Sequence, residues 1–236
     1  MHSVRTLSEL TDVSDPAWPE LRGSLDRAEV DVDVLPVAAE AGRRTLYRLQ
    51  VTARSTLGAL ALHTGGVRVD HGWLTILGGG HADLPDIATA SGLGEPEPGG
   101  APPGSLVVAL DVFGGRFAVN GGGLPGRPGE VCYFAPDRLD WLALGAGHSA
   151  FVGWALGGGL ADFAADRRWP GWQDEVGRLE PGRGLSVYPP LWSAESRAGI
   201  AAASRKPVPL AELTALQEDA ARQLSGLPDG AQTDLA

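Results

Sequence analysis

The run from Leu106 to Phe113 most constrains the fold, because nearly every residue in it is apolar and Gly114-Gly115 then interrupt it. A second extended run, Arg116 to Asn120, follows at once. Paired glycines adopt the positive φ angles that a two-residue type I′ turn requires. We therefore predict a β-hairpin in which Phe113 lies opposite Arg116.

The same stretch matches the dinucleotide-binding fingerprint in its spacing, Gly121-x-Gly123-x-x-Gly126. The fingerprint works where a helix begins at its third glycine and points its N-terminus at a pyrophosphate. Two prolines fall in that segment here, and a strand pattern follows from Glu130 to Ala135. We therefore predict turns and strands at these glycines, and no nucleotide cradle.

Further extended runs lie on either side of turn sequences. Val30 to Leu35 alternates with period two, and hairpins are expected at residues 70–72 and 136–137. Apolar spacing predicts helices over residues 4–10, 16–28, 38–49, 56–63, 149–156, 160–169 and 209–224. We predict a single α+β domain over residues 1–225, with helices on a twisted, mostly antiparallel sheet of five to six strands. A flexible tail is expected at 226–236.

Composition narrows the class of function. The chain has 236 residues, and 29 acidic against 19 basic residues give a formal charge of −10. A negative field repels phosphate backbones, so we expect no nucleic-acid partner and expect any protein partner to be basic. One cysteine, no signal-peptide pattern and no membrane-length apolar run predict a cytoplasmic protein with no membrane partner.

One group of residues has the chemistry of a metal site. His81 and Asp83, with the later His148, supply two imidazoles and a carboxylate, which can hold iron(II) and leave positions open for oxygen and substrate. The alternative is that His148 has an ordinary capping role, since it comes just before an expected helix start. A metal-dependent enzyme is therefore one of two function hypotheses.

The other hypothesis is binding without catalysis and without a cofactor. Polar residues beside rigid strands make good recognition platforms. In the predicted register Asp111 lies diagonal to Arg116, within reach of an exposed charge pair. The predicted binding residues are Asp70, His71 and Trp73 at the first hairpin, and Asp111, Arg116 and Asn120 on the mixed face of the second.

Several long stretches resemble a known family. "DVFGGRFAVNGG", "PGEVCYFAPDRLDW" and "RRWPGWQDEV" resemble a bacterial family labelled domain of unknown function 2625, from about Arg5 to about Leu224. Shorter pieces, Thr64-Gly65-Gly66 and the strand Gly129 to Tyr133 among them, are more distantly similar to the SUKH superfamily. That likeness implies an α+β, SUKH-like fold and a protein-interaction module with an immunity-like role.

Overall fold

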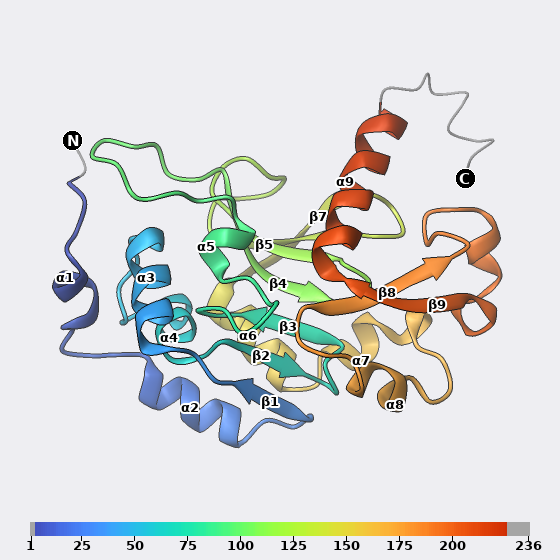
Figure 1. The fold of residues 1–236 in the computed structure, drawn as a ribbon, viewed down its shortest axis with the longest axis horizontal. Coiled ribbons are helices and arrows are strands. Elements are labelled where there is room, and N and C mark those ends of the chain that lie inside the picture. Colours follow the sequence, from blue (N-terminus) through green and yellow to red (C-terminus); the bar gives the residue numbers. More distant parts are fainter. Residues whose placement is uncertain (1–2, 226–236) are drawn as a thin grey trace.

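Consecutive extended runs of the chain pair with their neighbours to make one large sheet (Figure 1). The computed structural model describes residues 3–225, apart from the side chains of residues 197, 198 and 225. Seven antiparallel strands follow one another in chain order: β1 (Val32–Leu35), β2 (Gly66–Val69), β3 (Leu74–Leu77), β4 (Ser105–Asp111), β5 (Arg116–Asn120), β6 (Glu130–Ala135) and β7 (Asp140–Gly147). The predicted α+β class is confirmed, but the predicted count of five to six strands was too low.

Helices cover the sheet on both faces. They are α1 (Leu7–Thr11), α2 (Trp18–Asp26), α3 (Ala39–Leu49), α4 (Thr56–His63), α5 (Ile87–Ala90), α6 (His148–Leu156), α7 (Leu160–Phe163), α8 (Trp172–Gly177) and α9 (Leu210–Ser225), with three short 3₁₀ helices at Ala165–Arg167, Glu195–Ala198 and Ile200–Ala202. Residues of α2, α4, α6, α7 and α8 join the larger hydrophobic core on one face. A smaller core on the other face takes residues from α3, α5 and α9.

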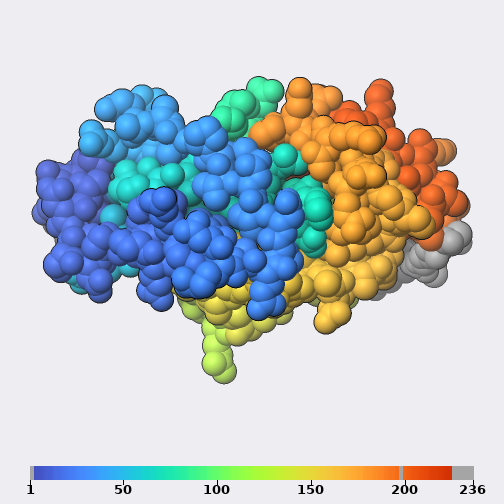
Figure 2. All heavy atoms as spheres, turned by 90° about the horizontal axis from the view of Figure 1, so that it is seen from below, coloured from blue at the N-terminus to red at the C-terminus, as the bar shows by residue number. Residues whose placement is uncertain are grey.

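The outer surface of the larger helical layer joins distant parts of the chain. Figure 2 shows the blue N-terminal segments lying beside the yellow and orange segment that carries α6 to α8.

Among residues 3–225, no helix has both the length and the apolar character needed to cross a membrane. The predicted tail at 226–236 lies outside the described residues, and the single-domain organisation stays a prediction.

A separate two-stranded ribbon, β8 (Arg183–Tyr188) with β9 (Ser204–Pro209), was not predicted. Proline lacks the N–H that a ladder needs, so Pro207 and Pro209 argued against a strand. The two prolines stand two residues apart and therefore share one side of β9, whose strand partner within residues 3–225 is β8 alone. An edge strand tolerates proline on its unpaired side.

The predicted β4–β5 hairpin forms, but its register differs from the prediction. Leu110, and not Phe113, lies opposite Arg116, and a bulge between Val107 and Ala109 shifts the rest of the ladder. The turn is wider than two residues because the Asp111 side chain closes it. Its Oδ1 accepts hydrogen bonds from the backbone N–H groups of Phe113, at 2.9 Å, and Gly115, at 2.8 Å.

The carboxylate of Asp111 is buried and continues into a polar chain. Its Oδ2 accepts a 2.7 Å hydrogen bond from the Tyr133 hydroxyl, which in turn accepts one of 2.7 Å from Nη1 of Arg167. Burial raises the pKa of Asp111, while the charge of Arg167 and these hydrogen bonds oppose the rise. The predicted exposed pair of Asp111 with Arg116 was wrong, because the turn amides and Tyr133 take up the carboxylate oxygens.

The backbone of this turn also holds three other elements. The Val112 N–H donates to Trp73 O at 2.9 Å, and the Leu185 N–H donates to Val112 O at 2.7 Å. From α9, Gln217 donates through Nε2 to Phe113 O at 2.6 Å. Gly114 has φ +82°, and a Cβ there would lie 2.9 Å from the Cβ of Leu213. Glycine is therefore required both by the turn and by the close approach of α9.

The fingerprint-like glycines lie in an irregular loop. Residues 121–129 form bends and turns, and β6 begins directly after them at Glu130. No helix starts at Gly126, whose φ is +84°. The prediction of turns followed by a strand at these glycines is confirmed.

Substitution of Asp111 tests how far the turn depends on its carboxylate. Asp111→Ala leaves two backbone N–H groups and the Tyr133 hydroxyl without an acceptor, so we expect the free energy of unfolding to fall by about 3–5 kcal/mol. Asp111→Asn keeps one carbonyl oxygen for the turn and should cost less, about 1–3 kcal/mol. Urea denaturation measures both. Equal stability of the two variants would contradict the capping role.

Candidate functional site

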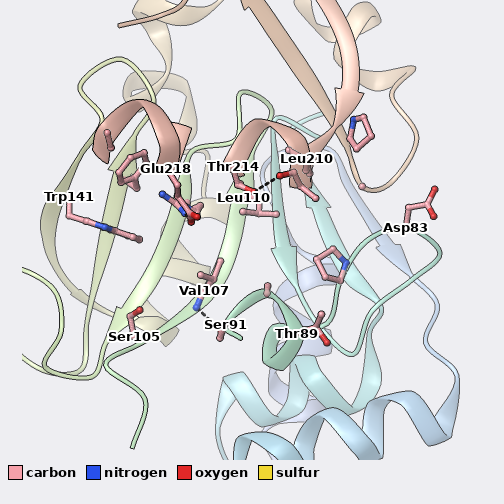
Figure 3. A pocket seen from close by; sticks show the side chains of 18 of the residues that line it. Asp83, Thr89, Ser91, Ser105, Val107, Leu110, Trp141, Leu210, Thr214 and Glu218 are labelled. Carbon is pink, nitrogen blue, oxygen red and sulfur yellow. Dashed lines mark hydrogen bonds and ion pairs between the residues drawn. The ribbon is translucent and has the colours of Figure 1, made fainter. Parts of the chain in front are cut away.

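A groove lies between α9 and the face of β4 to β7 (Figure 3). Its volume is about 1000 Å³. Residues of α5, including Thr89, and of the segment before β8, Gly182, complete its walls. We call this the α9 groove. Binding sites for small ligands and peptide segments are commonly of this size.

A row of four side chains crosses the floor of the α9 groove. The strand registers place Leu110 opposite Arg116, Arg116 opposite Phe134, and Phe134 opposite Trp141, on β4, β5, β6 and β7 in turn. All four line the groove. Because side chains alternate between the faces of a strand, this register alone brings a cation and two aromatic rings onto the same face.

Arg116 is the buried charge of this floor, with 8% of its surface exposed. Its guanidinium lies 4.3 Å from the centre of the Phe134 ring and 5.6 Å from that of Trp141. Nη1 donates to Oε1 of Glu218 on α9. Burial lowers the pKa of Arg116, and the charge of Glu218 opposes that shift. The ion pair thus joins the sheet to α9 across the groove.

Two of the hydroxyl groups on the rim, those of Ser91 and Thr214, are engaged with the backbone of the protein itself. Ser91 Oγ donates to Ile87 O at 2.7 Å and accepts from the Val107 N–H at 2.9 Å, which fastens α5 to β4. Thr214 Oγ1 donates to Ala211 O at 3.0 Å. Histidine and cysteine are absent from the described residues that line the groove. Thr89 Oγ1 donates to Oδ2 of Asp86 at 2.6 Å, in the cap of α5.

The structure places the first predicted binding group elsewhere. Trp73 is buried in the core, and Asp70 pairs with Arg168, whose guanidinium lies 4.1 Å from the centre of the Trp172 ring. Of this group His71 is the most exposed, with 42% of its side chain accessible and its Nδ1 4.0 Å from Asp31 Oδ1. These residues hold the β2–β3 turn to the α8 region, and a binding role for them stays a prediction.

Asn120 is buried and organises the loop that follows β5. Its Oδ1 accepts from the N–H groups of Gly122, at 2.7 Å, and Leu124, at 3.1 Å. Its Nδ2 donates to Leu124 O at 2.9 Å. Of the predicted binding residues, Arg116 lines the α9 groove, and Asp111 and Asn120 shape the two ends of β5.

The alternative metal site is not supported. Across residues 3–225, no group of three or more histidine, cysteine, aspartate or glutamate side chains could hold a metal ion. His81 Nδ1 hydrogen-bonds Pro36 O at 2.9 Å, and Asp83 lies on the rim of the α9 groove. His148 begins α6. The three residues match a metal-ligand set by residue type, but the fold does not bring them together into a metal site.

Sequence reasoning missed most of the groove. Phe134 and Trp141 looked like ordinary strand residues, and Thr214 and Glu218 lay on the polar side of an amphipathic helix. The alternation along β6 and β7 could have shown which side chains share a face. No local signal indicated that α9 would stand over that face.

The structure defines an α+β protein with a groove built against an antiparallel sheet. The chain belongs to the family described as protein of unknown function DUF2625, which matches residues 7–213. It is 39% identical over 216 residues to the uncharacterized protein YbfG of Escherichia coli (strain K12), covering 91% of this chain and 96% of that protein. It is 32% identical over 201 residues to an uncharacterized protein of Haemophilus influenzae, covering 84% and 86%.

No solved structure gives a significant match. The family resemblance expected from the sequence is therefore confirmed. The more distant likeness to the SUKH superfamily is not confirmed.

His148 provides a pH-dependent test of the packing around α6. Both ring nitrogens are sealed and have no hydrogen-bond partner among the described residues, although part of the residue reaches the surface. Burial lowers its pKa from 6.5 to about 4. As the pH falls from 6.5 to 4, the unfolded chain therefore binds a proton that the folded protein does not. The free energy of unfolding therefore falls by up to about 3 kcal/mol between pH 6.5 and pH 4.

The measurement compares wild type with His148→Gln by urea denaturation between pH 8 and pH 4. At pH 8 the histidine is neutral in both states, so the difference there gives the cost of the substitution alone. We expect the wild type to lose more stability than the variant as the pH falls. Parallel pH profiles would contradict the burial of a neutral imidazole.

Proposed function

We propose that the protein is a non-catalytic interaction module that binds an extended segment of a partner protein in the α9 groove. The observation that carries this proposal is an apolar floor left open beside a polar rim. Val107, Leu110 and Trp141 lie on that floor, while Ser105 and Thr214 stand on the rim. Grooves of this composition suit a polypeptide, which offers apolar side chains and polar backbone groups together.

The dimensions support a short segment. The floor crosses four neighbouring strands, which lie about 4.8 Å apart, and so extends about 14 Å. An extended chain advances about 3.3 Å per residue, so the groove has room for about four residues.

The charge of the protein supports a basic partner. A formal charge of −10 attracts a positively charged protein over long range and raises the rate of encounter at low salt. An immunity-like role is the finer form of the same proposal, in which the partner is a toxin that this protein neutralises. Co-expression tests that role: the partner should slow growth when it is expressed alone and should not when this protein is present.

A groove-filling substitution tests the proposed function. Thr214→Trp places an indole in the α9 groove, whereas Ala215→Trp adds the same side chain at an exposed position of α9 outside the lining. Affinity capture from the native host should recover a partner with wild type and with Ala215→Trp. With Thr214→Trp we expect recovery to fall at least about tenfold, the loss that corresponds to about 1.4 kcal/mol.

Both alternatives to this result are informative. A partner recovered equally by the two tryptophan variants would bind elsewhere on the molecule and would refute the groove. Recovery of no partner by the wild type at low and moderate salt would count against an interaction module.

A further inference from the structure

We propose that Arg116 binds the C-terminal carboxylate of the segment in the α9 groove, and that Glu218 occupies this position in the free protein. The inference rests on the proposed function and names the chemical group that the groove recognises.

A guanidinium offers its donors along two edges, and Glu218 uses only one of them. Glu218 accepts from Nη1. Nε is buried and has no hydrogen-bond partner among the described residues. A buried donor without an acceptor is costly, and a carboxylate is the group that accepts from two guanidinium nitrogens at once. The arrangement therefore leaves Arg116 incompletely satisfied in the free protein.

The two partners of the ion pair differ in exposure. The side chain of Glu218 is 53% exposed, whereas that of Arg116 is 10% exposed. Glu218 can therefore turn into water at little cost, while Arg116 stays on the groove floor. Exchange of one carboxylate for another keeps the buried cation neutralised, whereas a neutral ligand that displaced Glu218 would leave it unpaired.

The aromatic rings hold the guanidinium in place during such an exchange. Phe134 and Trp141 attract the guanidinium to their faces, and a cation stacked on an aromatic ring keeps its in-plane N–H donors available. Arg116 is therefore a preformed hydrogen-bond donor for a planar anion, which lowers the cost of ordering when a ligand binds.

The surroundings favour a chain terminus over an acidic side chain. Leu110 on β4 lies directly opposite Arg116 on β5. Val107, also on β4, lies on the groove floor as well. A C-terminal residue brings an apolar side chain and a carboxylate on one Cα, which matches an arginine beside apolar residues. The ligand that fits is an apolar segment that ends in a free carboxylate.

Two α9 variants with the same change of charge test this inference. Glu218→Gln removes the competing carboxylate at Arg116, and Asp219→Asn removes a neighbouring exposed carboxylate that pairs with Arg222. The probes are acetylated tripeptides ending in leucine, valine or phenylalanine, each as the free acid and as the amide, with octanoate as a small carboxylic acid. Calorimetry measures the affinities. Tryptophan fluorescence follows the same binding, and a fluorescence change that is lost in Trp141→Phe arises in the groove.

We expect the free acids to bind Glu218→Gln at least about tenfold more tightly than wild type, since the ligand no longer has to displace a charged hydrogen bond at Arg116. Asp219→Asn should bind as wild type does. The amides should bind at least about tenfold more weakly than the acids. Arg116→Gln should remove this preference for the acid.

Other outcomes overturn the inference and separate it from the proposed function. Equal affinities of Glu218→Gln and Asp219→Asn for the acids would refute a role for Glu218. If the amides bind as tightly as the acids, the groove binds peptides without recognising their carboxylate, and the inference is wrong while the proposed function stands. Octanoate binding without peptide binding would refute the chain terminus as the ligand, as would the failure of every probe. The Thr214→Trp capture experiment decides the proposed function independently.

Discussion

The buried carboxylate of Asp111 is the constraint on which the rest of the structure depends. By accepting two turn amides and the Tyr133 hydroxyl, it sets the width of the β4–β5 turn and therefore the register of the central hairpin. The backbone of the same turn then bonds to Trp73 just before β3, to β8 and to α9. Because each of these bonds is made inside the protein, a change in the turn displaces elements from distant parts of the chain.

The α9 groove is a consequence of that anchoring. Helix α9 is held to the turn by Gln217 and by the close approach of Leu213. Thr214 and Glu218 of the same helix line the groove, and Glu218 pairs with Arg116 on the floor. The exposed partner of that ion pair can move without loss of the anchor. The geometry thus combines a floor of paired strands with one half-exposed ion-pair contact, and the proposed binding function uses both.

The success of sequence reasoning depended on the range of the interaction. Turns at residues 70–72 and 136–137 follow from local chemistry and were predicted correctly. The register at Arg116 was wrong, because a carboxylate side chain and not the glycine pair set the turn. Of the candidate functional residues, Arg116 and Asp83 line the groove, and neither was predicted to do so. The ribbon of β8 and β9 was missed because its prolines are permitted only at an edge, which is a tertiary property.

The amino-acid sequence by itself determined the alternation of strands and turns, the helical stripes and the absence of a phosphate-binding helix at Gly126. Each of these depends on φ angles and side-chain periodicity within a few residues. Tertiary structure alone decided which groups meet: Asp111 with Tyr133, and Arg116 with Glu218, 102 positions further along the chain. The physical reason is that the energy of a buried charge depends on its surroundings, and those surroundings come from strands and helices that are distant in sequence.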